Sequence, residues 1–399
     1  MTSRREFVAA GLAGYSLTRP VLGTPVAPRA PRPAPPFEPW LEIDASAIRH
    51  NAGTVSRLAG GRPIVAVVKN NTYGLGLELV GPIVDRLPEV HTLAVVRASE
   101  AFSLRKAGVR KPILLMNRAS DEEAVELARK QVRLAVFGDD APDQLTRVAR
   151  STGKPVAGHL YMDTGMNRMG QRVDRSAEWL GRLAAGHALR IEGTFTELTE
   201  EPDFDIEQAA RLRDFAGQVT AAGLQPGPLH AASSLEVFHR PETHLDMVRP
   251  GFALWGGYVS NEARAAGGLQ PAFTLKAPVI RVEFLNVGDG VSYFRPWKAE
   301  RPTWIAVLAI GHADGYPRTA VKGAEALIGD RLFKVIGAVS ASHTILELGA
   351  EQVVRVGDIA TLIGRGNEAI HPNEVATRSE TSAYDRFMHL SAGLRRVLV

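Results

Sequence analysis

A lysine ends an apolar run early in the chain. The run is VAVVK at residues 65–69, and the polar segment NNTYG at residues 70–74 follows it. An amine at the end of a buried strand loses hydration, which lowers its pKa and suits it to Schiff-base formation. The alternative is an ordinary lysine whose ammonium group reaches solvent. Lys69 is therefore a candidate nucleophile, and the polar segment after it could hold an anionic group.

Lys69 ends the first of eight short apolar or β-branched runs that alternate with amphipathic segments. The runs cover residues 64–69, 92–96, 112–117, 132–137, 156–163, 191–196, 229–234 and 247–255. Eight βαβ units most simply close as a (β/α)₈ barrel. An open doubly wound sheet is the competing architecture, but residues 74–76 lack the third glycine of a dinucleotide fingerprint. Barrel enzymes carry their chemistry where the strands end, which here means Lys69, Asp163, Thr196, Glu197, Ser233, Ser234 and Arg249.

The pattern changes near residue 270. Strand-like runs at 273–284, 303–310, 332–339, 344–348 and 359–363 are separated by turn residues, which predicts an all-β domain. Residues 40–43 also resemble a strand and precede a helix start at Asp44. We therefore expect an α/β barrel over 46–270, a β domain over 271–399, and a strand within 37–45 that packs with the β domain.

Composition excludes several classes of protein. The 399 residues are 45% hydrophobic and 23% charged, as in globular proteins, and include no cysteine. Disulfides, thiolate metal sites and cysteine nucleophiles are thus excluded, and we predict no metal site. Residues 1–36 hold five arginines and one glutamate, so they carry the whole net charge of +4. The remaining chain is neutral, which argues against nucleic-acid binding.

The leader, residues 1–36, resembles a twin-arginine export signal. Ser3, Arg4, Arg5 and Phe7 precede a weakly apolar run at 9–17, which is too short to span a membrane. A Pro- and Ala-rich linker follows over 24–36. We expect the twin-arginine machinery to export the folded protein to the periplasm, with a tightly bound cofactor already loaded. A tail with two chance arginines is the alternative.

Several segments, in order, resemble motifs of the alanine racemase family. They are VVKNNTYG at 67–74, MDTGMNRMG at 162–170, HAASS at 230–234, VRPGFALWG at 248–256, VSY at 291–293, GHADGYPR at 311–318, VS at 339–340 and TSAY at 381–384. The resemblance runs from about residue 37 to the C-terminus. It implies a (β/α)₈ barrel followed by a β domain, and a pyridoxal 5'-phosphate (PLP)-dependent racemase that interconverts L- and D-amino acids.

The resemblance also implies roles for single residues. Lys69 would carry PLP as a Schiff base and act as one catalytic base. Tyr293 would be the second base; in the family it comes from the partner subunit of a homodimer. Racemisation needs such a pair because the proton leaves one face of the substrate and returns to the other.

The remaining implied roles concern the cofactor and the substrate. Arg249 would donate to the pyridine nitrogen of PLP, and Arg168 would lie near its phenolic oxygen and the substrate carboxylate. The phosphate would be held by Tyr73, Ser234, Tyr384 and the backbone at Gly251. His312 and Ala341 would border the substrate. Read singly, each has a plainer explanation: Tyr293 as a strand residue, Arg249 as an ion-pair partner, Ser233 and Ser234 as a helix cap.

The sequence departs from the family at four places. Tyr161 stands where many members have a carbamylated lysine that orients Arg168, so that charge support is expected to be absent. Glu197 replaces a usual histidine and could pair with Arg249. His312 replaces a tyrosine at the substrate entrance, and Ala341–Ser342 replaces a Met-Asp pair. These changes predict PLP chemistry with alanine or a broader substrate range. A PLP-dependent lyase or aldolase, and a non-catalytic PLP-binding paralogue, remain alternatives.

Overall fold

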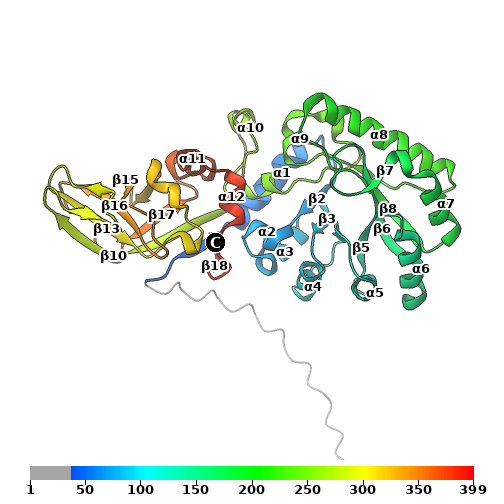
Figure 1. The fold of residues 1–399 in the computed structure, drawn as a ribbon, viewed down its shortest axis with the longest axis horizontal. Coiled ribbons are helices and arrows are strands. Elements are labelled where there is room, and N and C mark those ends of the chain that lie inside the picture. The colour runs from blue at the N-terminus through cyan, green and yellow to red at the C-terminus, as the bar shows by residue number, and fades with distance from the viewer. Residues whose placement is uncertain (1–36) are drawn as a thin grey trace, which may run out of the picture. The chain divides into compact units, whose positions relative to one another are not determined.

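The structure is a computed structural model that describes residues 37–399. Its first part is a barrel of parallel strands with helices on the outside (Figure 1). Their order is β2-β3-β4-β5-β6-β8-β9, and β7 (Gln171–Arg172) pairs with β6. The strands are β2 (Ile64–Val67), β3 (Val90–Val95), β4 (Ile113–Leu115), β5 (Val132–Val136), β6 (Val156–Asp163), β8 (Leu189–Phe195) and β9 (Leu229–His230). All four side chains of β2 are buried, as in parallel sheets covered on both faces.

The ring closes without a regular eighth strand. Met247 bridges to His230 and Val248 bridges to Ile64, both in parallel. The Val65 N–H also donates to the Val248 carbonyl at 2.8 Å. The predicted run 247–255 is therefore extended only at its start, because Pro250 interrupts it and a 3₁₀ turn, η3 (Phe252–Trp255), follows. The expected barrel is confirmed, and the open-sheet alternative is wrong.

Helices follow the strands with capping that is visible in the sequence. They are α1 (Ala45–Leu58), α3 (Leu77–Asp85), α4 (Ala98–Lys106), α5 (Asp121–Arg129), α6 (Ala141–Thr152), α7 (Ala177–Gly186), α8 (Pro202–Ala221), α9 (Ser234–His239) and α10 (Asn261–Ala266). The Asp44 carboxylate accepts from the N–H groups of Ser46 and Ala47, which starts α1 where the sequence predicted a helix. Within residues 37–399 no helix is long and apolar enough to cross a membrane.

The second part is an antiparallel ring. Its order is β10-β13-β16-β15-β14-β17, and both β13 and β17 pair with β10. The strands are β10 (Phe273–Leu285), β13 (Thr303–Leu308), β14 (Glu325–Ile328), β15 (Arg331–Ile336), β16 (Thr344–Gly349) and β17 (Ile359–Ile363). Because β10 has 13 residues, its first half can pair with β17 and its second half with β13. The expected all-β domain is confirmed.

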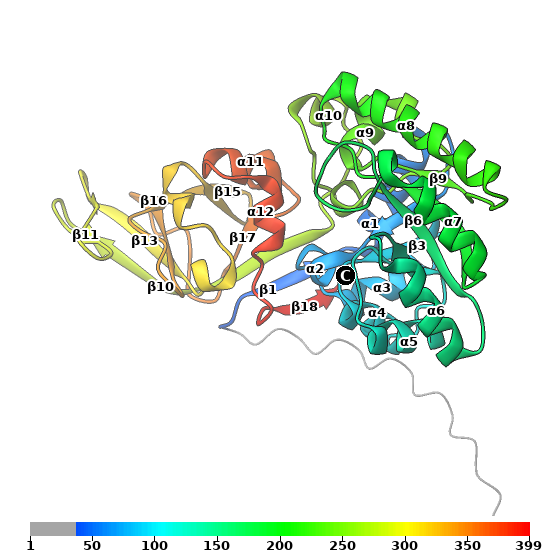
Figure 2. The same cartoon turned by 45° about the vertical axis from the view of Figure 1, so that its right-hand side comes forward.

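Both ends of the described chain add strands to the sheet that contains β10. The first strand, β1 (Trp40–Ile43), pairs antiparallel with β10, and the last, β18 (Arg395–Leu398), pairs parallel with β1. Figure 2 shows the small hairpin of β11 (Gly290–Val291) and β12 (Trp297–Lys298) beyond the end of β10. Two short helices, α11 (Pro372–Arg378) and α12 (Ala383–Met388), precede β18. The predicted export signal and linker lie outside the described residues.

Candidate active site

A cavity of about 550 Å³ lies where the barrel strands end. It gathers a lysine, two arginines, two carboxylates and hydroxyl groups from strands, loops and α12. Among the lining residues are Lys69, Tyr73, Tyr161, Arg168, Glu197, Ser234, Arg249, Gly251 and Tyr384. The structure thus brings together every predicted cofactor-binding residue. Tyr293, His312 and Ala341 do not line it.

Lys69 lies two residues beyond the end of β2 and opens a short helical turn, α2 (Lys69–Tyr73). Four consecutive residues of this turn, Asn70 to Tyr73, have φ between 53° and 56°. Left-handed backbone costs about 1–2 kcal/mol per residue for L-amino acids, so other contacts must hold the turn. The Asn71 side-chain oxygen accepts from the Leu77 N–H at 2.7 Å, and Glu100 accepts from the Asn71 N–H at 3.1 Å. The turn places both Lys69 and Tyr73 on the cavity wall.

Burial lowers the pKa of Lys69. Glu197 opposes this effect by raising the pKa, whereas Arg168 and Arg249 lower it further. A lowered pKa increases the neutral fraction of the amine, which is the form that attacks an aldehyde. The environment of Lys69 therefore fits the predicted Schiff-base lysine.

Hydroxyls and backbone N–H groups gather at one end of the cavity. Ser233 caps α9, which makes Ser234 the first residue of that helix. The Ser234 hydroxyl accepts from the N–H groups of Gly251 (3.2 Å) and Ala253 (3.1 Å) and keeps its own hydrogen to donate. Tyr73 and Tyr384 meet edge to face, with ring centroids 5.5 Å apart. Burial raises the pKa of both tyrosines, so they remain neutral donors suited to a phosphate.

Arg249 is buried and held from several sides. It donates to the Thr196 carbonyl at 2.7 Å, to Glu197 at 2.8 Å and to Nδ1 of His230 at 3.0 Å. Arginine only donates, so Nδ1 of His230 must accept, and its Nε2–H then donates to His159 at 3.0 Å. Burial lowers the pKa of His159 to about 3 and that of His230 well below its ordinary value, which keeps both rings neutral.

One donor of Arg249 is left for the cofactor. Within residues 37–399 its Nε–H has no hydrogen-bond partner, while Nη1 and Nη2 are both engaged. A guanidinium that keeps its proton suits an unprotonated pyridine nitrogen. His230 begins the HAASS segment, but no role was predicted for it or for His159, which lies behind it. Their inward positions on β6 and β9 were the available signal.

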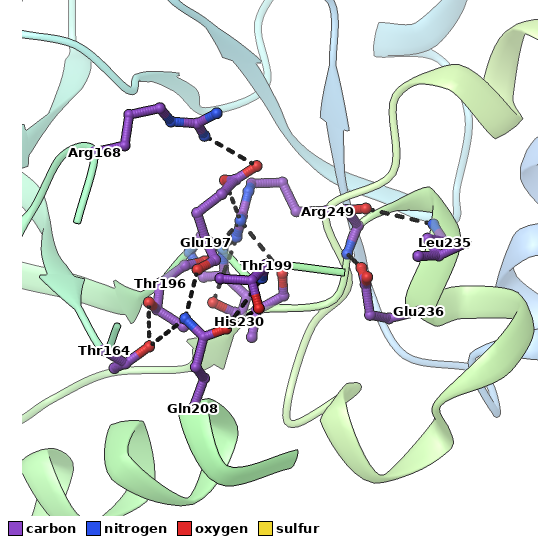
Figure 3. A network of polar contacts seen from close by, with 12 residues as sticks. Thr164, Arg168, Thr196, Glu197, Thr199, Gln208, His230, Leu235, Glu236 and Arg249 are labelled. Atoms are coloured by element: carbon purple, nitrogen blue, oxygen red, sulfur yellow. Dashed lines mark hydrogen bonds and ion pairs between the residues drawn. The ribbon is translucent and has the colours of Figure 1, made fainter. Parts of the chain in front are cut away.

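Glu197 lies between Arg168 and Arg249 (Figure 3). Tyr161, which we expected to leave Arg168 without charge support, packs its ring on Phe195 with centroids 4.3 Å apart. The structure nevertheless gives Arg168 a carboxylate partner, because Glu197 lies 3.6 Å from its guanidinium. That partner comes from the end of β8 instead of β6.

The other predicted residues line a separate cavity of about 890 Å³ in the β domain. Tyr293, His312 and Ala341 lie there together with Arg318 and His343, and no residue is shared with the barrel cavity. Tyr293 is 81% exposed and its neighbour Phe294 is fully exposed. A single chain therefore presents the two predicted bases, Lys69 and Tyr293, in different cavities.

Comparison with known proteins agrees with this geometry. The family model for the alanine racemase N-terminal domain matches residues 43–259, and that for the C-terminal domain matches residues 272–398. The chain belongs to the alanine racemase family. The curated alanine racemase of Desulforamulus reducens is 33% identical over 369 residues, covering 90% of this chain and 98% of its own length. That of Methanococcus maripaludis is 30% identical over 371 residues, covering 90% and 98%.

Solved structures show the same similarity in three dimensions. Alanine racemase from D-cycloserine-producing Streptomyces lavendulae has a TM-score of 0.84 at 28% identity, covering 92% of this chain and 98% of its own. Alanine racemase from Bacillus anthracis with bound L-Ala-P has a TM-score of 0.81 at 29% identity, covering 91% and 95%. Members of this family are PLP-dependent racemases, so the expected enzyme class and cofactor are confirmed. The lyase and non-catalytic alternatives receive no support.

Proposed function

We propose that this member of the alanine racemase family racemises amino acids with two bases that come from different copies of the chain. Lys69 of one copy moves a proton at Cα on one face, and Tyr293 of the other copy moves a proton on the opposite face. PLP, when bound, supplies the electron sink that makes the Cα–H bond acidic. The observation that carries the proposal is the partly buried Lys69 amine, with its lowered pKa, beside Arg168 and Arg249 on one cavity wall.

The other cavity residues bind and orient. Arg249 offers its free Nε–H to the pyridine nitrogen, and its buried contacts to Thr196 and His230 fix its direction. The hydroxyls of Tyr73, Ser234 and Tyr384 hold the phosphate. Arg168 is the cation left to bind the substrate carboxylate.

A homodimer follows from the positions of the two bases. Tyr293 and Phe294 are the most exposed aromatic side chains among the described residues. A second copy that covers them would bury apolar surface and bring Tyr293 to a barrel cavity that lacks a second base. The dimer is thus the arrangement that completes the site.

Substrate range is set at the β-domain cavity in this proposal. Ala341 is smaller than the methionine usual in the family, and Ser340, Ser342 and His312 add polar groups to a mainly apolar wall. A smaller side chain at position 341 does not by itself create a strong preference for one substrate, since each buried methylene contributes only about 1 kcal/mol. The smaller side chain does remove a steric clash with larger substrates, so the enzyme accepts longer or polar amino acids as well as alanine.

Export completes the proposal. The Arg4-Arg5 leader supports translocation of the folded, cofactor-loaded protein to the periplasm. A racemase of broad range placed there would not scramble the cytoplasmic pool of amino acids.

The proton chemistry can be tested directly. Purified holoenzyme is incubated with single L-amino acids in deuterated solvent, and deuterium at Cα and optical rotation are followed. We expect deuterium incorporation with loss of rotation, and no reaction from Lys69→Ala. Borohydride should attach the cofactor to Lys69 in the wild type. Bound cofactor without Cα exchange for any common amino acid would contradict racemisation.

The substrate range needs a panel. We expect wild-type kcat/KM to fall less than tenfold between alanine and a longer polar amino acid. Ala341→Met should lower kcat/KM for the longer amino acid about tenfold relative to that for alanine, because the larger side chain restores the clash with the longer substrate. Strict alanine specificity in the wild type, unaltered by Ala341→Met, would be inconsistent with this proposal.

A further inference from the structure

Glu197 joins two arginines of the barrel cavity. One carboxylate oxygen accepts from Nη2 of Arg249 at 2.8 Å, and the other lies 3.6 Å from Nη2 of Arg168. The Arg249 side chain is 2% exposed, that of Glu197 30% and that of Arg168 58%. The carboxylate thus connects a fixed, buried guanidinium to an exposed one that must be held in place to bind substrate (Figure 3).

The backbone under Glu197 is held by α8. The Gln208 amide donates to the Glu197 carbonyl at 3.1 Å, and its side-chain oxygen accepts from the Thr199 N–H at 3.0 Å. Asp205, which is fully buried, accepts from the same N–H at 3.0 Å. The loop after β8 is therefore anchored at Glu197 itself and two residues after it, at Thr199, which restricts where the Glu197 carboxylate can lie.

Charge balance in the cavity depends on this carboxylate. Lys69, Arg168 and Arg249 bring three cationic side chains to the wall, against the carboxylates of Glu197 and Glu200. Glu197 exerts the largest charge effect on Lys69, ahead of Arg168, Arg249 and Glu100. Without Glu197 the two arginines would face each other and Lys69 with no paired anion.

At Tyr161 on β6, where many family members carry a carbamylated lysine, this chain has an aromatic side chain packed between two others. Tyr161 on β6 is buried between Phe195, stacked at 4.3 Å, and Phe137, edge-on at 5.4 Å. Tyrosine cannot form a carbamate, so β6 offers Arg168 no carboxylate-like group at this position.

We propose that Glu197, itself held by Arg249, is the positioning residue for Arg168, replacing an anion on β6 with one in the loop after β8, so that alignment of Arg168 needs no carbon dioxide. This deepens the proposed function and rests on it for the role of Arg168. A glutamate is permanently present, whereas a lysine carbamate depends on dissolved carbon dioxide. The arginine pair is therefore set by the polypeptide alone.

The test compares holoenzymes carrying Glu197→Gln, Glu197→Asp and Glu200→Gln. The first variant keeps the shape and removes the charge, and the second keeps the charge on a shorter side chain. Glu200 lines the same cavity but forms no ion pair with Arg168 or Arg249. Two quantities are measured: KM and kcat for the preferred amino acid, and the pH dependence of the visible absorption of the bound cofactor.

Glu197→Gln should raise KM about tenfold or more, with a smaller fall in kcat, because Arg168 loses its anchor. The midpoint of the absorption titration should fall by about one pH unit, since an anion that stabilised the protonated site is gone. In Glu197→Asp the pH midpoint of the titration should stay close to the wild-type value. Glu200→Gln should lower this midpoint less than Glu197→Gln does. Equal behaviour of Glu197→Gln and Glu200→Gln in both measurements would overturn the proposal.

Carbon dioxide provides an independent arm. Wild-type activity in degassed buffer should equal that with added bicarbonate, and a rise on adding bicarbonate would contradict a permanent anion. If the holoenzyme racemises no amino acid, the proposed function fails. The absorption titration would still decide whether Glu197 sets the charge of the cofactor site.

Discussion

At Gly251 the chain leaves no room for a side chain. A Cβ at this position would lie 2.1 Å from the Tyr73 hydroxyl oxygen. Its N–H also donates to Ser234, so this one residue joins two of the hydroxyls that would hold the cofactor phosphate. A side chain at this position would therefore disturb binding of the cofactor phosphate and would not touch the two proposed bases directly.

Gly251→Ala should therefore weaken PLP binding. Displacing Tyr73 from its packed position costs about 1–3 kcal/mol, which corresponds to roughly 5- to 150-fold in affinity. Gly181→Ala in α7 is the matched control, because a Cβ there meets nothing within 4 Å. The measurement is titration of the cofactor-free protein with PLP. Equal affinities for the two variants would show that the contact carries no weight.

At the scale of elements, β6, β8 and β9 together place an aromatic and imidazole stack inside the barrel. Tyr161 stacks on Phe195, and Phe195 stacks on His230 with centroids 5.0 Å apart. His230 in turn connects Arg249 to His159. Side chains from three neighbouring strands thus hold the Arg249 guanidinium in place. This arrangement requires His159 and His230 to be neutral.

This neutrality predicts acid sensitivity of folding. Burial lowers the pKa of His159 to about 3, whereas the unfolded value is about 6.5. Between these values the unfolded chain binds more protons, so stability falls as the pH drops from 6.5 towards 3. Each such histidine contributes up to about 1.4 kcal/mol per pH unit. His159→Gln should flatten the slope of unfolding free energy against pH, measured by urea denaturation.

His187→Asn is the control for that slope. His187 is exposed and ends α7 with φ 48°, a conformation that asparagine accepts. This variant should keep the wild-type slope. A slope unchanged by His159→Gln would mean that other buried groups, such as His230 and His371, account for the acid sensitivity.

At the scale of the whole molecule, the two bases that we propose lie in separate cavities of one chain. The barrel cavity holds Lys69, and the β-domain cavity holds Tyr293, with no shared residue. Covalent continuity between the domains therefore does not complete the catalytic pair. Association of two copies would complete two sites at once, as expected for a two-fold dimer.

Subunit mixing tests this arrangement. Lys69→Ala and Tyr293→Phe chains should each be inactive, and unfolding and refolding them together should restore activity. Random pairing makes about half of the dimers mixed, each with one complete site, so about a quarter of wild-type activity should return. Each variant refolded alone serves as the control. Full activity in a wild-type monomer at low concentration would rule the shared site out.

Much of this protein could be predicted from local sequence. The apolar run before Lys69, the Asp44 cap and the alternation of strands and helices follow from periodicity and capping, which act over a few residues. The short strands β14 and β18 were missed because they are brief, and two of the four residues of β18 are arginines. Only pairing with β15, β17 and β1 makes them strands.

What the tertiary structure alone decided is which side chains meet. The family resemblance predicted that Arg168 lacks the charge support of a carbamylated lysine, and folding brings Glu197, from the loop after β8, to within 3.6 Å of its guanidinium. No prediction placed His159 and His230 behind Arg249, or Lys69 at the start of a left-handed turn. Local patterns report hydrophobic periodicity and backbone preference. Contacts between residues dozens of positions apart depend on the closure of the barrel, which no local pattern contains.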